Sequence, residues 1–208
     1  MEPETEGRNF IDLKDIYGKP IVKMFIDETS RSSGEGWVHY LRTKPDGIFP
    51  AWKSSFLKRV KAPSGKVYIV GCGIYNMKIE KEIISNVVDE AAALIEKEGP
   101  AAFDRIRDKT GPFVFLDTYV FVDRPDGVEL VNPAFPSVEG KNFMNFMDAT
   151  GKYLAAEYID TALKKGSGWV TYLWPKPGET RPSIKHSYVK KAVYGGEAFI
   201  VGSGAYLE

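Results

Sequence analysis

The sequence of 208 residues contains one cysteine and two histidines, so it offers few of the side chains that bind metals or form disulfides. Cys72 alone can form neither an internal disulfide nor a CxxC metal or haem motif. No stretch approaches the roughly 18 consecutive apolar residues of a membrane-spanning helix. The opening MEPETEGRNF also lacks the basic and apolar regions of an export signal. We therefore expect neither a membrane span nor an export signal in this sequence.

The sequence has no excess of charge of either sign. Lys and Arg together number 28, as do Asp and Glu, which gives a formal net charge of zero. Because no run of basic residues is present to attract a polyanion, we expect no nucleic-acid partner. With 43% hydrophobic and 27% charged residues, the composition is typical of a folded soluble chain and excludes a disordered one.

What the chain does contain is two copies of one unit. GEGWVHYLRTKP (34–45) matches GSGWVTYLWPKP (166–177) at eight of twelve positions. The match extends upstream, from 7–27 to 140–160, and downstream, from KSSFLK to KHSYVK and from VGCGIY to VGSGAY. The offset drifts only from 133 to 131 residues. Such self-similarity indicates a duplicated domain.

Only the second copy contains the region from Met77 to Glu139. It begins with MKIEKEIISNVVDEAAALIEKEG, in which apolar residues recur at helical spacing until Gly99 and Pro100. This pattern predicts a long amphipathic helix. The runs GPFVFLDTYVFVD and VELVNP, separated by RPDG, predict two strands joined by a turn at Asp126-Gly127.

The portion that both copies share predicts short helices followed by three antiparallel strands. In the second copy, residues 141–163 are expected to be helical with a break near Gly151, and the strands are GWVTYLW, RPSIKHSYVKKAV and EAFIVGSGAY. The predicted fold class is α+β, with an antiparallel sheet flanked by a long N-terminal helix, in duplicate. Residues 77–208 are expected to form the complete copy. Residues 1–76 are expected to lack the long helix and the first hairpin.

These runs resemble a known family. EGKNFMNFMDATGKY, GSGWVTYLWPKPG, KHSYVKKAV and FIVGSGAY resemble the Cache domains of bacterial and archaeal receptors, specifically the single-calf type. Those domains are PAS-like extracytoplasmic sensor modules. The resemblance covers the whole chain and implies a pocket on one face of the sheet for a small organic acid or similar metabolite. It also implies signalling through the long helix to membrane and output segments that this sequence does not contain.

Candidate ligand-binding residues follow from the alternation of side chains along a strand. Val170, Tyr172 and Trp174 share one face of their strand. A small anion held away from water needs a cationic side chain, directional donors and aromatic walls. The second copy supplies this chemistry on its strands, hairpin and short helices, at Tyr172, Trp174, Lys185, Ser187, Tyr188, Tyr119, Asp117 and Tyr153. Aromatic residues on a sheet are also common in cores, so packing is the competing interpretation for each of them.

The first copy offers a smaller set. Tyr40, Arg42 and Lys53 could hold a carboxylate there, with Arg42 in the place of Trp174. The competing interpretation is that Arg42 is a solvated strand residue.

The remaining polar residues fit structural roles. Neither His39 nor His186 is repeated in the other copy, so both are expected to be packing or surface residues and not metal ligands or bases. Asp15 and Asp148 each precede a turn and are expected to cap its backbone. We predict no metal site among these residues.

The leading functional prediction is a non-catalytic extracytoplasmic sensor that binds a small organic acid and signals by helix displacement. The alternative is a protein-interaction or dimerisation module without a ligand, because an incomplete first copy would leave a sheet edge and an apolar face open to a partner, including a homodimer partner. Neither GCG nor GSG extends to a nucleophile-elbow, dinucleotide or phosphate-binding motif. We therefore predict no enzymatic activity and no cofactor.

Overall fold

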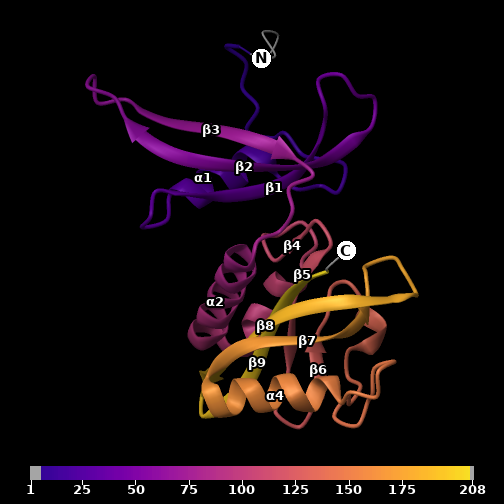
Figure 1. Cartoon of the computed structure of the whole chain (residues 1–208). Coiled ribbons are helices and arrows are strands. Elements are labelled where there is room, and N and C mark those ends of the chain that lie inside the picture. Colours follow the sequence, from indigo (N-terminus) through magenta and orange to yellow (C-terminus); the bar gives the residue numbers. More distant parts are fainter. Residues whose placement is uncertain (1–5, 207–208) are drawn as a thin grey trace. The chain divides into compact units, whose positions relative to one another are not determined.

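The computed structural model describes residues 6–206 and divides the chain into two compact units, Met1–Lys78 and Ile79–Glu208. Each unit contains an antiparallel sheet with helices packed against it (Figure 1). The predicted α+β class is confirmed. No helix within the described residues is both long and apolar enough to cross a membrane.

The first unit consists of one helix and a three-stranded sheet. Helix α1 spans Ile21–Thr29, and the strands, in the order β1-β2-β3, are Glu35–Thr43, Pro50–Lys61 and Val67–Tyr75. The helix covers one face of this sheet and forms a small core with it, made of Ile21, Val38, Tyr40 and Leu57 and flanked by Leu13, Met24 and Phe25.

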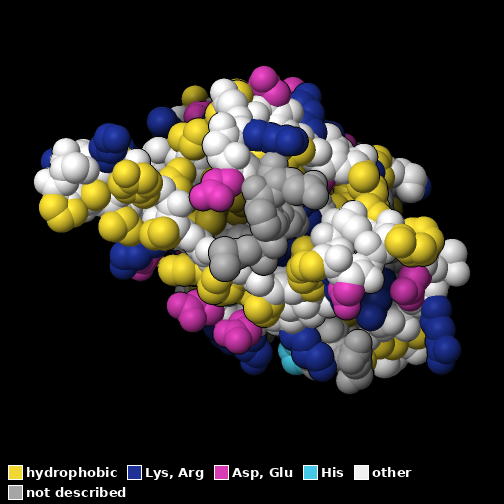
Figure 2. All heavy atoms as spheres, turned by 90° about the horizontal axis from the view of Figure 1, so that it is seen from above, with side chains coloured by type: hydrophobic (Ala, Val, Ile, Leu, Met, Phe, Trp, Pro, Cys, Tyr) yellow, Lys and Arg dark blue, Asp and Glu magenta, His cyan; other side chains and the backbone are white. Residues whose placement is uncertain are grey.

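The other face of this sheet carries exposed hydrophobic side chains. In strand β3, Tyr68 and Val70 are each 52% exposed. Hydrophobic side chains gather with lysines and arginines toward the end of the β2–β3 hairpin (Figure 2). Because β3 pairs only with β2 in the described part of this unit, it is an edge strand.

The second unit contains the long helix that its sequence pattern predicts. Helix α2 spans Lys81–Glu98 and ends at Gly99, whose φ of 61° suits glycine. The other helical segments are η2 (Gly99–Ala102), α3 (Phe103–Arg107), η3 (Pro136–Val138) and α4 (Leu154–Lys165).

The second unit has a larger sheet than the first. Its main path runs β4-β5-β9-β8-β7, and β6 pairs with β5. The strands are β4 (Val114–Phe115), β5 (Thr118–Asp123), β6 (Glu129–Val131), β7 (Ser167–Pro175), β8 (Pro182–Tyr194) and β9 (Glu197–Tyr206). All of these pairs are antiparallel, and β9 lies between β5 and β8.

Helices α2 and α4 bury apolar stripes at this sheet. Helix α2 packs on β8 and β9 through an apolar stripe that contains Ile84, Val88 and Ile95. Helix α4 packs on β7 and β8, and its Leu154, Tyr158 and Ile159 join the core cluster there. That cluster also includes Tyr172 of β7 and Val189 of β8, so the core lies on the face that carries these side chains.

The expected helix over residues 141–163 is shorter than predicted, because residues 141–153 form turns and α4 begins only at Leu154. One oxygen of the Asp148 carboxylate accepts hydrogen bonds from the backbone N–H groups of Thr150 and Lys152. The other oxygen accepts from the N–H of Leu173 at 2.9 Å. These bonds hold the backbone in a turn that competes with a helix.

The first unit repeats this arrangement. Asp15 accepts from the N–H groups of Tyr17 and Lys19 with one oxygen and from Leu41 at 3.0 Å with the other. The predicted backbone-capping role of Asp15 and Asp148 is therefore confirmed in both copies.

Candidate ligand-binding site

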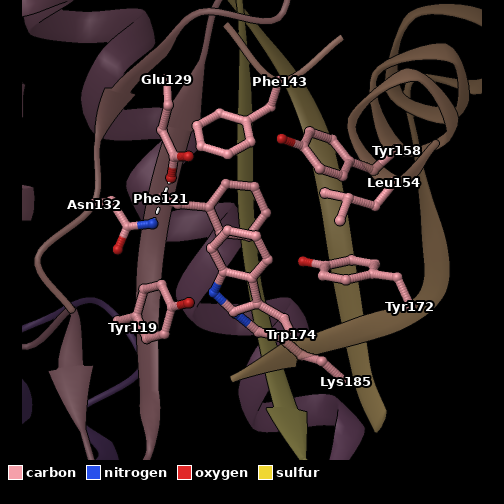
Figure 3. A pocket seen from close by; sticks show the side chains of 10 residues that line it. All are labelled: Tyr119, Phe121, Glu129, Asn132, Phe143, Leu154, Tyr158, Tyr172, Trp174 and Lys185. Carbon is pink, nitrogen blue, oxygen red and sulfur yellow. Dashed lines mark hydrogen bonds between the residues drawn. The ribbon is translucent and has the colours of Figure 1, made fainter. Parts of the chain in front are cut away.

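The second unit contains a cavity on the α4 side of its sheet (Figure 3). It has an empty volume of about 290 Å³, including the part open to solvent. It is lined by Tyr119, Phe121, Glu129, Asn132, Phe143, Leu154, Tyr158, Tyr172, Trp174 and Lys185.

Strand alternation brings these side chains together. Tyr119 and Phe121 lie two residues apart on β5 and face the cavity, as do Tyr172 and Trp174 on β7. Between β5 and β8, β9 contributes Gly202. A Cβ at this position would lie 2.2 Å from the Phe121 ring, so the glycine leaves the space that this ring occupies.

Lys185 provides the positive charge of the cavity. The residue is 1% exposed, and its Nζ lies 4.0 Å from the centre of the Tyr119 ring and 5.4 Å from the centre of the Tyr206 ring. It forms no ion pair among the described residues. Burial lowers the pKa of Lys185 to about 7, although the charges of Glu129 and Asp117 oppose this shift.

Three tyrosine hydroxyls add directional polar groups. Tyr172 shares a hydrogen bond of 2.9 Å with Ser187, and Tyr158 donates one of 2.9 Å to Asp123. The hydroxyl of Tyr119 is hydrogen-bonded to that of Tyr206. Burial raises the pKa of these three tyrosines and of Tyr206, so all of them are neutral at physiological pH.

Two carboxyl groups lie at the other end of β5. Asp123 of β5 and Glu129 of β6 are paired residues in the sheet, 0% and 5% exposed. Glu129 accepts a hydrogen bond from the side-chain amide of Asn132. Asp123 accepts one from Tyr158 with Oδ2, and its Oδ1 has no hydrogen-bond partner among the described residues.

Burial and mutual repulsion disfavour ionisation of this pair. Burial raises the pKa of Glu129 to about 7, with Asn132 and Lys185 opposing the shift and Glu139 adding to it. Burial and the neighbouring Glu129 raise the pKa of Asp123 well above its usual range. The pair therefore retains a proton near neutral pH.

Aromatic rings cluster around Trp174 at the cavity. The Trp174 ring lies 5.8 Å from Phe135, 6.0 Å from Phe143 and 6.2 Å from Phe146, measured between ring centres and all in edge-to-face geometry. This side of the cavity is therefore apolar.

The structure brings together about half of the residues selected from sequence. Tyr119, Tyr172, Trp174 and Lys185 line the cavity, and Ser187 holds the Tyr172 hydroxyl from behind. Three others do not line it. Tyr188 follows Ser187 and so faces the opposite side of β8, where its ring lies 5.3 Å from that of Trp169.

Tyr153 and Asp117 are the other two outside the cavity lining. Tyr153 immediately precedes α4 and is 49% exposed. Asp117 lies between β4 and β5 and reaches Lys185 only as a nearby charge.

Six lining residues were missed by sequence reasoning. Alternation from Tyr119 could have identified Phe121, because residues two apart share a strand face. No local pattern marks the others, since they come from β6, α4 and the connecting loops: Glu129, Asn132, Phe143, Leu154 and Tyr158.

The first unit repeats part of this site. Tyr40 and Ser55 share a hydrogen bond of 3.0 Å, as Tyr172 and Ser187 do. Nζ of Lys53 lies 5.2 Å from the centre of the Tyr75 ring, which parallels Lys185 and Tyr206. Arg42 lies on β1, paired with Ala51 of β2. Within the described residues of this unit the sheet ends at β3, so it has no strand that corresponds to β5 or β6.

The residues described offer no group of three or more His, Cys, Asp or Glu side chains that could hold a metal ion. His39 is 7% exposed and shares a hydrogen bond of 2.8 Å with Ser54. Burial, with a smaller effect from Lys19, lowers the pKa of His39 to about 4. Nδ1 of His186 shares a hydrogen bond of 3.0 Å with the hydroxyl of Thr171.

A sheet with a basic and aromatic cavity on one face defines a ligand-binding domain of the PAS-like class. More specifically, the chain belongs to the Cache domain family, whose model matches residues 1–104 and 96–208.

Two receptor proteins match part of the chain. A methyl-accepting chemotaxis protein of Pseudomonas putida, McpP, is 28% identical over 92 residues, which are 44% of this chain and 16% of McpP. The sensor histidine kinase MctS of Rhizobium johnstonii is 35% identical over 92 residues, or 44% of this chain and 19% of MctS. The region matched by this chain therefore spans less than a fifth of the length of either relative.

A solved structure, described as "Structural basis for carboxylic acid recognition by a Cache chemosensory domain", is also similar. It is 27% identical with a TM-score of 0.54, and the match covers 62% of this chain and 93% of that one. A methyl-accepting chemotaxis protein from Vibrio parahaemolyticus, 20% identical with a TM-score of 0.50 over 62% of this chain and 88% of its own, shares the fold.

Proposed function

We propose that the second unit is a non-catalytic sensor domain that binds a short carboxylate in the cavity beside Lys185. The observation that carries this proposal is a lysine 1% exposed that faces a cavity and lacks an ion-pair partner among the described residues. An unpaired buried ammonium is costly, and a carboxylate ligand would both neutralise it and accept its hydrogen bonds. The carboxylic acid recognition described for a Cache domain 27% identical to this chain supports the same ligand class.

We further propose that residues 77–208 form the complete sensor and that residues 1–76 form an incomplete copy. Tyr40 and Lys53 would be the remnant of a ligand site there, with Arg42 in place of Trp174. As in receptors of this family, we propose an extracytoplasmic location and signalling through displacement of α2. Helix α2 supports this role because it packs on β8, the strand that carries Lys185.

Isothermal titration of the whole chain with acetate, propionate, butyrate and pyruvate tests this function. We expect at least one acid to bind, and Lys185→Met to weaken it at least 30-fold, because removing one partner of a buried charge pair costs about 2–5 kcal/mol. Lys109→Met, at an exposed lysine of the second unit outside the cavity lining, is the control and should leave the affinity unchanged. Absence of binding by every acid, or equal binding by the Lys185→Met variant, would contradict the proposal.

A second candidate function is a dimerisation module, favoured by the exposed edge strand β3. Its apolar side chains include Val67, Tyr68, Val70 and Ile74, each about half exposed. Such an edge is a template for strand pairing between two chains. Light scattering at increasing protein concentration tests this candidate, and a mass of one chain at all concentrations would exclude it.

A further inference from the structure

We propose that the sheet of the first unit binds an amphipathic α-helix of net negative charge, supplied by a partner protein, on the face opposite α1. This helix would take the place on β2 and β3 that α2 takes on β8 and β9 of the second unit. The inference concerns the first unit alone and does not depend on the ligand proposed for the second.

Helix α2 shows what covers the equivalent face in the second unit. It packs on β8 and β9, and its Asp89 pairs with Lys190 of β8 at 2.8 Å. Nζ of Lys81, in the first turn of α2, lies 5.3 Å from the centre of the Trp169 ring of β7. Lys190 and Lys185 are an odd number of residues apart on β8, so this face is the one opposite the cavity.

The first unit has the same face, built in the same register. We call it the open face. It consists of Trp37, Phe56, Lys58, Val60, Tyr68 and Val70, the counterparts in the repeat of Trp169, Tyr188, Lys190, Ala192, Phe199 and Val201. Residues that are directly paired across the strands in one unit have counterparts that are directly paired in the other. The two units therefore present equivalent side chains at equivalent places on this face.

The open face is exposed where its counterpart is buried. Tyr68 and Val70 are each 52% exposed, whereas Phe199 and Val201 are 4% and 0% exposed. The helix described in the first unit, α1, packs on the other face of the sheet. Contiguous exposed apolar side chains of this kind mark a site of protein contact. The duplicated unit identifies the missing contact as that of an amphipathic helix.

The charge of the strands favours an acidic helix. Residues 50–75 contain five basic residues and no acidic one, and α2 contains five acidic residues and two basic ones. Lys58 pairs with Glu35 at 2.7 Å, but these side chains are 62% and 38% exposed. Such a surface pair contributes little to stability, so an acidic residue of the helix can replace Glu35. Complementary charge selects the partner and speeds its association.

Peptide binding to the whole chain tests the inference. The probe is a fluorescent peptide with the sequence of residues 79–98, stapled on its polar face because isolated helices of this length are marginal. We expect it to bind, as measured by fluorescence anisotropy. Val70→Asp should weaken binding about tenfold or more, since it places a charge in an apolar contact. Ile48→Asp, at a residue 84% exposed outside the open face, is the matched control and should bind normally.

Two further comparisons test the assigned charge. A second peptide, with its five acidic residues changed to glutamine, should bind the native chain more weakly than the first. Lys58→Glu should weaken binding of the acidic peptide and leave that of the glutamine peptide unchanged. Thermal unfolding of each variant checks that it is folded. Equal binding of the two peptides would refute an acidic partner.

Cys72 reports where the peptide binds. It is exposed and paired with Phe56, so it lies on the open face. Saturating acidic peptide should slow its reaction with a thiol reagent at least tenfold in the native chain. Unchanged reactivity would place the peptide elsewhere and overturn the inference, as would absence of binding or normal binding by Val70→Asp. A dimer in light scattering that the peptide does not dissociate would identify a second copy as the occupant, which also overturns it.

Discussion

The ammonium of Lys185 lies 4.0 Å from the centre of the Tyr119 ring, the closest of its three aromatic contacts. The two residues come from β8 and β5, with β9 between them. A ring face attracts a cation, so Tyr119 stabilises the charged form of a lysine that burial disfavours. Burial and the ring contact thus act in opposite directions on the charge of Lys185.

Substitution of Tyr119 should separate the effects of ring and hydroxyl. Tyr119→Leu is expected to weaken carboxylate binding about five- to thirtyfold, because a desolvated cation–π contact contributes about 1–2 kcal/mol. Tyr119→Phe keeps the ring and should lose less than threefold. Titration calorimetry measures both. If the two variants bind alike, the ring does not stabilise the lysine.

The affinity for a simple carboxylate should fall as pH rises. Burial lowers the pKa of Lys185 to about 7 and raises the pKa of Glu129 to about 7. Raising pH through 7 therefore neutralises the cation and ionises a neighbouring acid, and both changes disfavour a second anion. Asp123, Asp117 and Glu139 are the other acidic groups that affect these two residues.

Titrations with propionate between pH 6 and pH 8.5 check this expectation. We expect the affinity to decrease at least tenfold across this range in the native chain. In the Glu129→Gln variant the decrease should be smaller, since only Lys185 still titrates. An affinity that is constant with pH would show that neither group changes its charge near the ligand.

The Asp148 carboxylate should contribute to stability above pH 4 and lose that contribution in acid. Burial alone would raise its pKa, but hydrogen bonds from Thr150, Leu173 and Lys152 lower the pKa of Asp148 to about 2. Because the folded-state pKa lies below the unfolded value, its stabilisation is present above about pH 4 and is lost as pH falls toward 2.

Asp148→Ala is expected to reduce the free energy of unfolding of the second unit by about 1–3 kcal/mol, since it leaves several N–H groups without their acceptor. Asp15→Ala is the matched variant in the first unit and should destabilise that unit by a similar amount. Urea unfolding at pH 7 and pH 3 measures both. The Asp148→Ala effect should shrink at pH 3, and an unchanged effect would contradict the assigned pKa.

Strands β3 and β9 occupy equivalent places in the two copies, and a cysteine should be accessible to solvent on β3 but not on β9. Cys72 on β3 is exposed, whereas Ser203, its counterpart on β9, is 0% exposed and donates to the Tyr119 carbonyl at 2.9 Å. Cys72 should therefore react with a thiol reagent within the time expected of an unfolded peptide. A thiol introduced by Ser203→Cys, in a Cys72→Ser background, should react only after unfolding. Equal reaction rates would mean that β3 is covered in solution.

The sequence predicts those parts of the fold that leave a periodic pattern or a repeated segment. The helical spacing that ends at Gly99, and the turn at Asp126-Gly127, predicted α2 and the β5–β6 hairpin. The start of α4 was misplaced because apolar residues continue through 141–153, where the Asp148 carboxylate holds the backbone in a turn.

The site was predictable only where it lies on regular strands. Alternation grouped Tyr172 with Trp174, and both line the cavity. Tyr188 lies outside the lining because it is one residue out of phase with Lys185 and Ser187. Glu129 and Asn132 contact each other across a bend after a three-residue strand. No spacing rule brings a side chain from such a bend into a cavity, so the place of Glu129 and Asn132 in its lining could be found only in three dimensions.

Strand β8 carries Lys185 on its cavity face and, on its other face, Lys190, which pairs with Asp89 of α2 at 2.8 Å. One strand thus contributes to both the cavity and the contact with α2. Linkage between two equilibria is reciprocal. If the proposed ligand shifts the position of α2 when it binds, fixing α2 in that position must change the affinity for the ligand by the same factor.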